Sequence, residues 1–192
     1  TDVATEIRAL WLDDATPDSA QRFLNPALQL PAILIAEIAV ARLWMSWGIK
    51  PVALIGHSMG ENAAACIAGV LSFKRAVELV HLRGRLFTEI PAGGMLSVPL
   101  AEEDLLARLP EDLDLASVNA PELCVVSGTN DALDRFQASL AKDEIEAIRV
   151  PIDIAAHSRM LQPILERFEA FLKAGPLAAP KIPIVSNLTG TW

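Results

Sequence analysis

The sequence contains very little cysteine and histidine. Its 192 residues include two cysteines, Cys66 and Cys124, which are too few for a disulfide framework or a cysteine zinc site. Both lie in apolar runs, so we expect buried, reduced thiols of the kind found in cytoplasmic proteins. The three histidines, His57, His81 and His157, show no metal-ligand spacing. The sequence therefore predicts no structural metal.

Basic residues are also scarce. Sixteen lysines and arginines stand against 24 acidic residues, which gives a net charge of −8. Such a chain cannot neutralise a phosphate backbone on a large scale, which argues against a nucleic-acid-binding protein, and an anionic membrane surface is equally disfavoured as the main partner. Residues 1–12 carry Asp2, Glu6 and Arg8 and lack the apolar core of a secretory signal peptide. We expect a cytoplasmic location.

Long uninterrupted apolar runs are absent as well. The most apolar stretch, residues 28–44, contains Glu37 and Arg42 and falls short of the ~20 apolar residues that a membrane span needs. A buried helix is the better interpretation. Hydrophobic residues nevertheless make up 52% of the chain, enough for one sizeable core.

Two different patterns divide the chain. Helical periodicity predicts helices over residues 2–12, 31–47, 60–69, 73–89 and 158–173. Between two of them, residues 51–56 form a short apolar run bounded by proline and glycine. This run predicts a buried central strand, and its flanking helices predict a parallel sheet covered on both faces.

The middle of the chain predicts strands and helices in the order βαββαβ, which is the ferredoxin-like arrangement. The expected strands cover residues 95–100, 113–118, 123–127 and 146–150, and the expected helices cover residues 101–109 and 130–142. The sequence therefore predicts an α/β fold. A parallel-sheet, hydrolase-like core would occupy residues 1–92 and 151–192, discontinuous and incomplete, with an inserted ferredoxin-like small domain over residues 93–150.

The strongest motif is Gly56-His57-Ser58-Met59-Gly60, which matches G-x-S-x-G. It follows the predicted strand directly and opens a predicted helix, which is the setting of a nucleophile elbow. We expect the two glycines to avoid collisions across the turn. The serine hydroxyl would then project at the carboxyl end of the sheet, beside the amide groups of the helix N-terminus. The alternative, a serine that only caps the helix, fits the preceding strand less well.

A nucleophilic serine needs a base, and His157 is the preferred candidate because it precedes a helix in a loop. His57 is adjacent to the serine on the turn, and His81 lies within a predicted helix. Arg83, on the helix after the elbow helix, could hold a carboxylate in a bidentate fork. Its spacing alone is equally compatible with a solvated arginine, and Arg85 is an equal competitor.

These residues resemble a known family. Gly56-His-Ser-Met-Gly-Glu61 is similar to the G-H-S-x-G-E motif of malonyl-CoA:acyl carrier protein transacylases, above all of the acyltransferase domains of modular polyketide synthases. Further similar segments extend over the whole chain, at residues 31–44, 93–98, 117–121, 125–128, 150–158 and 184–190.

The resemblance implies a ping-pong acyl transfer. Ser58, activated by His157, would attack the thioester of an acyl-CoA, and the phosphopantetheine thiol of an acyl carrier protein would then take the acyl group from the serine. The N–H of Met59 would hold the oxyanion. Arg83 falls where the family binds the carboxylate of a malonyl or methylmalonyl extender.

The remaining implications concern binding groups and partners. His57 and Asn119 are further candidates for substrate binding. The resemblance implies no cofactor bound by the chain itself; the partners would be an acyl-CoA, an acyl carrier protein and other domains of the same synthase. An acidic carrier would need a local basic patch, for which the candidates by count are Arg149, Arg159, Arg167 and Lys181.

The sequence departs from the family at several points. Ile154-Ala-Ala-His157 matches neither the His-Ala-Phe-His pattern linked to malonyl nor the Tyr-Ala-Ser-His pattern linked to methylmalonyl. Met59 replaces a glutamine frequent in methylmalonyl domains, which favours malonyl, whereas Ala156 leaves room for a methyl branch. Leu30 stands where the family usually has glutamine. The family's Gly-Gln-Gly segment and a segment after Trp192 are absent, so we expect a piece of a longer protein.

Two other classes of function stay open. A serine esterase or thioesterase would place an acid between the serine and the histidine, where five aspartates lie: Asp112, Asp114, Asp131, Asp134 and Asp143. These aspartates fall in the predicted small domain rather than at the end of a main-sheet strand. A non-catalytic scaffold would usually have lost the serine or the histidine, and both are present.

Overall fold

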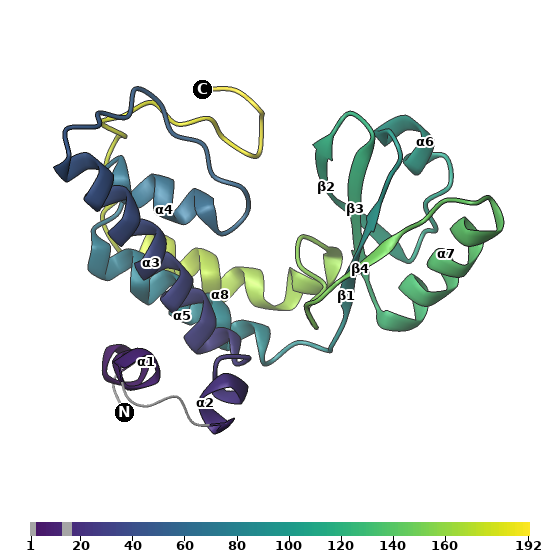
Figure 1. Cartoon of the computed structure of the whole chain (residues 1–192), viewed down its shortest axis with the longest axis horizontal. Helices are drawn as coiled ribbons and strands as arrows, with labels where there is room; N and C mark the ends of the chain where they lie inside the picture. Colours follow the sequence, from purple (N-terminus) through teal and green to yellow (C-terminus); the bar gives the residue numbers. More distant parts are fainter. Residues whose placement is uncertain (1–2, 13–16) are drawn as a thin grey trace. The chain divides into compact units, whose positions relative to one another are not determined.

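The computed structural model describes residues 3–12 and 17–192 (Figure 1). Backbone contacts divide the chain into two units: Thr1–Thr88 with Arg167–Trp192, called here the helical unit, and Glu89–Glu166, called the sheet unit. The expected start of the first helix at Asp2 lies outside the described residues.

The sheet unit contains β1 (Gly94–Val98), α6 (Glu102–Leu106), β2 (Leu113–Ala120), β3 (Leu123–Gly128), α7 (Asn130–Lys142) and β4 (Ile148–Val150). All strand pairs are antiparallel, and the strands lie in the order β2-β3-β1-β4 (Figure 1). The order of elements along the chain is the one predicted from the sequence.

One continuous core holds the sheet unit together. Leu96 and Val98 alternate along β1 and therefore share a face of the sheet. Leu133 and Phe136, at helical spacing on α7, pack against this face and are almost fully buried. The side chain of Thr129 starts α7 by accepting a hydrogen bond from the N–H of Ala132 at 3.3 Å.

The sheet unit extends past the predicted domain end after residue 150. The N–H of Gly93 donates to the carbonyl of Asp153 at 3.3 Å. Ala155 is fully buried and lies against Gly93 so closely that a Cβ at Gly93 would come within 2.7 Å of its methyl group. These contacts tie residues 151–166, and with them His157, to the start of β1.

The helical unit contains α1 (Val3–Leu12), α2 (Pro17–Arg22), α3 (Pro26–Ser46), α4 (Gly60–Ile67) and α5 (Phe73–Phe87). A short 3-10 helix (Arg159–Leu161) leads into α8 (Gln162–Lys173), and the part of α8 from Arg167 onward belongs to this unit. Its main core joins α3, α4, α5 and α8 through buried or partly buried residues that include Leu34, Ile38, Leu79, Val80 and Phe168.

α3 begins earlier than predicted. The side chain of Asn25 accepts a hydrogen bond from the N–H of Ala27 at 3.0 Å, and Pro26 occupies the first helical position, where a missing N–H costs nothing. Pro31, predicted near the start, lies inside the helix. Close packing fixes this end, because a Cβ at Gly84 of α5 would overlap the backbone of Pro26 and Ala27.

The predicted buried strand over residues 51–56 is not formed. Leu54 makes a single parallel bridge with Ile184, with hydrogen bonds of 2.8 Å to the carbonyl of Pro183 and 2.9 Å from the N–H of Val185. Val52 and Ile55 are 88% and 74% exposed. Since this bridge is the one strand pairing in the described part of the helical unit, the parallel sheet expected from the apolar run is absent there.

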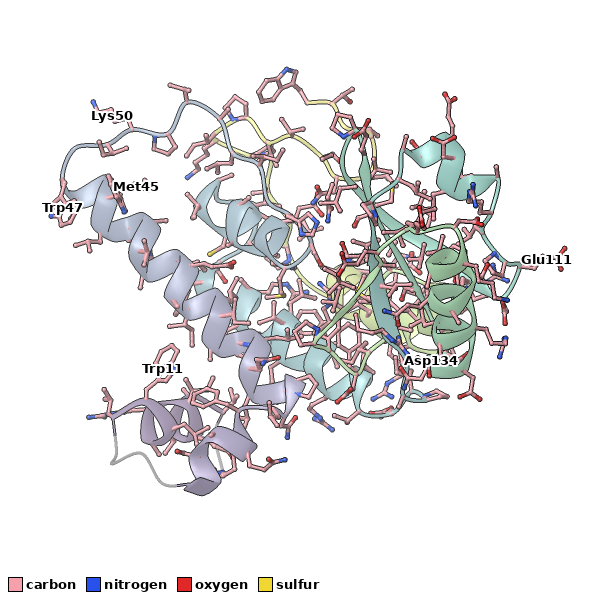
Figure 2. The ribbon with its side chains drawn as sticks, turned by 45° about the vertical axis from the view of Figure 1, so that its right-hand side comes forward. Trp11, Met45, Trp47, Lys50, Glu111 and Asp134 are labelled. Carbon is pink, nitrogen blue, oxygen red and sulfur yellow. The ribbon has the colours of Figure 1, made fainter. Side chains whose placement is uncertain are left out.

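α3 is also less buried than the sequence predicts. Within the described residues it is the one helix long and apolar enough to cross a membrane, judged by length and composition alone. Leu34 and Ile38 are buried, but Trp44 and Trp47 are 53% and 67% exposed. Met45 and Trp47 stand at the outer end of the helix in Figure 2. The prediction of a buried helix therefore holds for one face of its first half only.

Candidate active site

Ser58 occupies a strained turn between the extended segment 51–57 and α4. Its φ is +50°, in the left-handed region that residues other than glycine rarely adopt. The carbonyl of His57 accepts the N–H of Gly60 at 2.9 Å, and that of Ser58 accepts the N–H of Glu61 at 3.2 Å. A strained residue of this kind costs about 1–3 kcal/mol and is typical of functional sites. The turn therefore has the backbone form expected of a nucleophile elbow.

The two glycines of the motif have different roles. A Cβ at Gly56 would overlap the backbone of Gly60 and Glu61, so the close approach of strand end and helix start requires glycine there. A Cβ at Gly60 would meet nothing nearer than Oε1 of Glu37, at 4.0 Å. The expectation that both glycines avoid a collision is thus confirmed for Gly56 and wrong for Gly60.

Asn187 is a site residue that the motif did not reveal. Its side-chain amide donates to the carbonyl of Gly56, and its backbone N–H donates to Oε1 of Glu61 at 2.9 Å. Together these bonds tie the C-terminal segment to both sides of the elbow. No local sequence pattern marks it; in the structure it follows Ile184, the parallel neighbour of Leu54, at the edge where the carboxyl ends of the two segments meet.

The N-terminus of α4 adds an electropositive end to this turn. Met59 is the N-cap residue of α4, and its N–H takes no part in the turn hydrogen bonds described above. The aligned peptide dipoles of a helix concentrate partial positive charge at the first turn. An anion that forms beside Ser58 would therefore be stabilised there.

Arg83 reaches this turn from α5. Its Nη1 lies 3.9 Å from the sulfur of Met59, and its guanidinium lies 5.3 Å from the ring centre of Phe87. Burial lowers the pKa of Arg83, but arginine keeps its charge at neutral pH. No carboxylate among residues 3–12 and 17–192 pairs with it in the structure. A desolvated cation of this kind can bind an anionic group.

The competing residues for these roles are placed elsewhere. Arg85, which spacing could not separate from Arg83, is exposed. His81 lies within α5, where its Nδ1–H donates to the carbonyl of Ala27 at 2.9 Å, so it joins α5 to α3. His57 is exposed on the turn before Ser58. The structure therefore brings Ser58, Met59 and Arg83 together in the helical unit.

His157 and Asn119 belong to the sheet unit. Like Ser58, His157 adopts the left-handed region, with φ of +57°, and it is exposed in the turn before the 3-10 helix. Asn119 is exposed on β2, where the register with β3 is irregular between Val118 and Ala120. The predicted roles of both residues stay predictions.

Most charged candidates of the sheet unit are already paired. Four of the five candidate acids face arginines: Asp112 with Arg135, Asp114 with Arg159, Asp134 with Arg149 and Asp143 with Arg108. These pairs occupy two of the basic residues considered for carrier docking, Arg149 and Arg159. The pairing favours a structural role for these carboxylates.

Metal ligation finds no support in the described part of the chain. No group of three or more His, Cys, Asp or Glu side chains there could hold a metal ion. Cys66 and Cys124 are buried and free, as their apolar surroundings predicted. Burial raises the pKa of both thiols, which makes them poor nucleophiles.

Comparison with known proteins gives a consistent family. The model of the acyl transferase domain matches residues 23–191. A phenolphthiocerol/phthiocerol polyketide synthase protein of Mycobacterium tuberculosis is 38% identical over 162 residues, which are 84% of this chain and 11% of that protein.

Solved structures agree with this match. The acyl transferase domain of ZmaA superposes with a TM-score of 0.88 at 38% identity, over 97% of this chain and 44% of that one. The malonyl CoA-acyl carrier protein transacylase of Coxiella burnetii gives 0.84 at 30% identity, over 96% and 62%. This chain thus spans a small part of the curated synthase and about half of these structures. The chain belongs to the acyl transferase domain family, as do the acyltransferase domains of polyketide synthases that it resembles.

Proposed function

We propose that this chain transfers an acyl group from an acyl-CoA to the phosphopantetheine thiol of an acyl carrier protein, through an ester on Ser58. The observation that carries the proposal is the turn itself. Ser58, with its backbone φ in the left-handed region, lies directly before the N-cap residue of α4. The half-buried guanidinium of Arg83 contacts that N-cap residue, Met59. Nucleophile, oxyanion donor and anion receptor thus come from one small region of the helical unit.

In the proposed first step, the hydroxyl oxygen of Ser58 attacks the thioester carbon while His157 removes its proton. The tetrahedral oxyanion is stabilised by the N–H of Met59 and the positive end of α4. As the intermediate collapses, the carbon–sulfur bond breaks, and His157 returns the proton to the departing CoA thiolate. The thiol of the carrier repeats the sequence in reverse order and releases Ser58.

Arg83 would select the acyl group. A malonyl group carries a free carboxylate, which a guanidinium can bind through two parallel hydrogen bonds. The name of the Coxiella relative, a malonyl CoA-acyl carrier protein transacylase, supports malonyl over methylmalonyl. His57 and Asn119 are proposed as further contacts with the substrate. The chain would supply extender units to the other domains of a polyketide synthase in the cytoplasm.

We also infer that the sheet unit is a ferredoxin-like small domain inserted in a hydrolase-like core. The strand order β2-β3-β1-β4 with α6 and α7 packed on one face supports this inference. The paired aspartates described above weaken the hydrolase alternative, because arginines already hold four of the five carboxylates that such a triad could use.

Mass spectrometry of the intact protein after incubation with malonyl-CoA tests the proposal directly. We expect one malonyl group, localised by peptide mapping to Ser58, and none on the Ser58→Ala variant. His157→Ala should slow acylation by about 10²–10⁴-fold, as loss of a general base does, while His81→Ala changes it little. Transfer of the label to a carrier thiol rather than to water separates a transferase from a hydrolase. Equal labelling of the Ser58→Ala variant would show that Ser58 is not the nucleophile.

Arg83 can be tested against Arg85 on the same helix. Replacing Arg83 with alanine should slow malonyl transfer by about 10- to 100-fold, the range for lost hydrogen bonds to a charged group. Acetyl transfer, which offers no free carboxylate, should change much less. Arg85→Ala is the matched control and should affect neither substrate. An equal loss for malonyl and acetyl in Arg83→Ala would give Arg83 a structural role instead.

A further inference from the structure

The turn that carries His157 needs an external support. With φ of +57°, His157 adopts a conformation that an imidazole side chain keeps only where the surroundings impose it. Ser158 supplies part of this support: its hydroxyl donates to the carbonyl of Ala155 at 2.7 Å and accepts the N–H of Met160 at 3.2 Å. Both bonds stay within the turn, so they shape it without fixing it to the sheet.

Asp114 of β2 adds a second fixed point after His157 in the chain, beyond the contacts that Asp153 and Ala155 make with Gly93 before it. Its Oδ2 accepts the backbone N–H of Arg159 at 2.8 Å. Its Oδ1 accepts Nε and Nη2 of the same guanidinium at 2.9 and 2.7 Å. One carboxylate therefore binds both the backbone and the side chain of a residue two positions after His157. Nε also lies 3.2 Å from Oδ2. The hydrogen bonds from Arg159 lower the pKa of Asp114, which keeps the carboxylate ionised and able to accept all four.

Asp114 lies on β2, an edge strand of the sheet. In β2, Asp114 stands opposite Ser127 of β3, which is fully buried and donates to the carbonyl of Gly94 at 3.3 Å. The side chain of Asp114 is only 22% exposed, against 64% for Arg159. Asp114 is thus the more buried of the two side chains. Because it lies on a strand, we expect it to restrain the turn that contains Arg159.

The other arginine–aspartate pairs of the sheet unit lack this feature. Among the described residues, Asp112, Asp134 and Asp143 accept only guanidinium groups in the structure. Asp112 is the closest comparison, because it lies two residues before Asp114 and pairs with Arg135 at 2.6 Å. Its hydrogen-bond partner is on α7, and toward Arg159 it contributes charge only.

We propose that Asp114 is a positioning residue for His157: by binding the backbone N–H and the guanidinium of Arg159, it fixes the left-handed turn from which the imidazole acts on the serine. The inference rests on the proposed function, because it gives His157 a role in proton transfer. Asp114 itself contacts no reacting atom. Its effect is on the geometry of the base, where displacements of about 1 Å can cost 10²-fold in rate.

The first experiment separates the chemical step from substrate binding. Asp114→Ala should lower the acylation rate constant at saturating malonyl-CoA by about 10- to 100-fold, as expected when a reacting group is displaced by up to about 1 Å. The KM for malonyl-CoA should stay within about twofold. Asp114→Asn, which keeps an oxygen for the N–H of Arg159, should lose less, and so should Arg159→Ala. Asp143→Ala, which removes the partner of Arg108, is the matched control and should keep the parent rate.

The second experiment is a double-mutant cycle with His157→Ala. If Asp114 acts through the imidazole, Asp114→Ala should have no further effect on the residual rate once His157 is gone. A merely structural aspartate would lower the rate equally in both backgrounds, and that result would overturn the inference. If circular dichroism shows that Asp114→Ala does not fold, Asp114→Asn replaces it in the cycle. If Asp114→Asn then has the parent rate, Asp114 is needed for folding and not for positioning His157.

The two proposals fail in different ways. If His157→Ala leaves acylation unchanged, the proposed function loses its base, whatever Asp114 does. If His157→Ala slows acylation as expected and Asp114→Ala does not, the function stands and the positioning role is wrong. A rise in KM without a fall in the rate constant would also contradict positioning, because it would place Asp114 in substrate binding.

Discussion

The two units of this chain bury their large apolar side chains to different degrees. In the sheet unit, strands and helices enclose one core in which Leu96, Leu105 and Leu133 are fully buried. The helical unit also has buried centres, but it leaves large apolar side chains in solvent, among them Trp47, Val52 and Ile55. The sheet unit exposes fewer large apolar side chains than the helical unit, although Ile148 and Leu106 are also 63% and 50% exposed.

The two units also differ in how they support the candidate site residues. The helical unit contains Ser58, whose turn is held by the close approach at Gly56 and by Asn187 from the far end of the chain. The sheet unit contains His157, whose turn is held by Asp114 on a strand of the same unit. The proposed nucleophile is supported by segments distant in sequence and so depends on long-range folding, whereas the proposed base is supported within its own unit.

The largest expected effect tests the completeness of the sheet-unit core. Leu105 and Leu106 are adjacent on α6, but the first is fully buried and the second is 50% exposed. Leu105→Ala should cost about 2–5 kcal/mol of unfolding free energy through lost burial and the cavity left behind. Leu106→Ala should cost less than about 0.5 kcal/mol. Hydrogen exchange of peptides from β1 and β3 measures the loss where it occurs, and equal losses for the two variants would contradict a single closed core.

The next effect concerns the elbow of the helical unit. Gly56→Ala places a methyl group into the backbone of Gly60 and Glu61, so we expect a cost of about 1–3 kcal/mol from overpacking and a loss of serine acylation. Gly60→Ala finds open space and should change stability by less than about 0.5 kcal/mol. Tryptophan fluorescence measures both, because all four tryptophans, Trp11, Trp44, Trp47 and Trp192, lie in the helical unit. A tolerated Gly56→Ala would mean that the turn can open without loss.

The sequence predicted the sheet unit better than the helical unit, for a physical reason. α7 begins at Asn130 and ends at Lys142, as its periodicity predicts, and the order of all six elements follows from turn residues between short apolar runs. These signals are local, because each strand pairs with neighbours inside the same segment. Residues 51–56 show the opposite case. Their apolar composition predicts a central strand, but pairing requires other strands, and the described helical unit supplies only Ile184.

The same distinction applies to the candidate site. Ser58 and the need for Gly56 could be read from the motif, since a strained turn imposes both. Arg83 could not be separated from Arg85 by spacing, because the choice depends on which side of α5 packs toward Met59. Asn187 lies 131 positions from its partner Gly56, and no local pattern encodes a contact of that separation. Asp114, offered as one of five acids, gains its significance only from the N–H of Arg159.

A smaller effect should come from the exposed apolar surface of the helical unit. Trp47 is 67% exposed at the end of α3 (Figure 2), so Trp47→Ser should change the unfolding free energy by less than about 0.5 kcal/mol. Clustered exposed apolar side chains promote association, and the variant should therefore self-associate less in analytical ultracentrifugation. Lys50→Ser, a polar change in the same region, is the control. A large loss of stability in Trp47→Ser would show that this side chain is already packed.

The smallest expected effect contrasts how the two units treat their carboxylates. In the sheet unit Asp112, Asp114, Asp134 and Asp143 face arginines. In the helical unit, Oε2 of Glu37 on α3 is buried and has no hydrogen-bond partner in the described part of the chain. Burial therefore raises the pKa of Glu37 above its usual value. An acid whose pKa is raised in the folded state destabilises the folded chain once the pH is high enough for the unfolded chain to ionise it.

The sign of the pH dependence follows from this shift. Below about pH 4, Glu37 is protonated in both the folded and the unfolded chain and makes no difference. As the pH rises through the folded-state pKa, the unfolded chain ionises more readily, so the folded chain loses stability relative to a neutral variant. Glu37→Gln should thus gain stability over the parent between acidic and neutral pH, by an amount that grows with pH and then levels off. Tryptophan-monitored urea unfolding at several pH values measures the difference. The exposed Glu78→Gln on α5 is the control, and a Glu37→Gln advantage that shrinks as the pH rises would mean that Glu37 gains a cationic partner on folding.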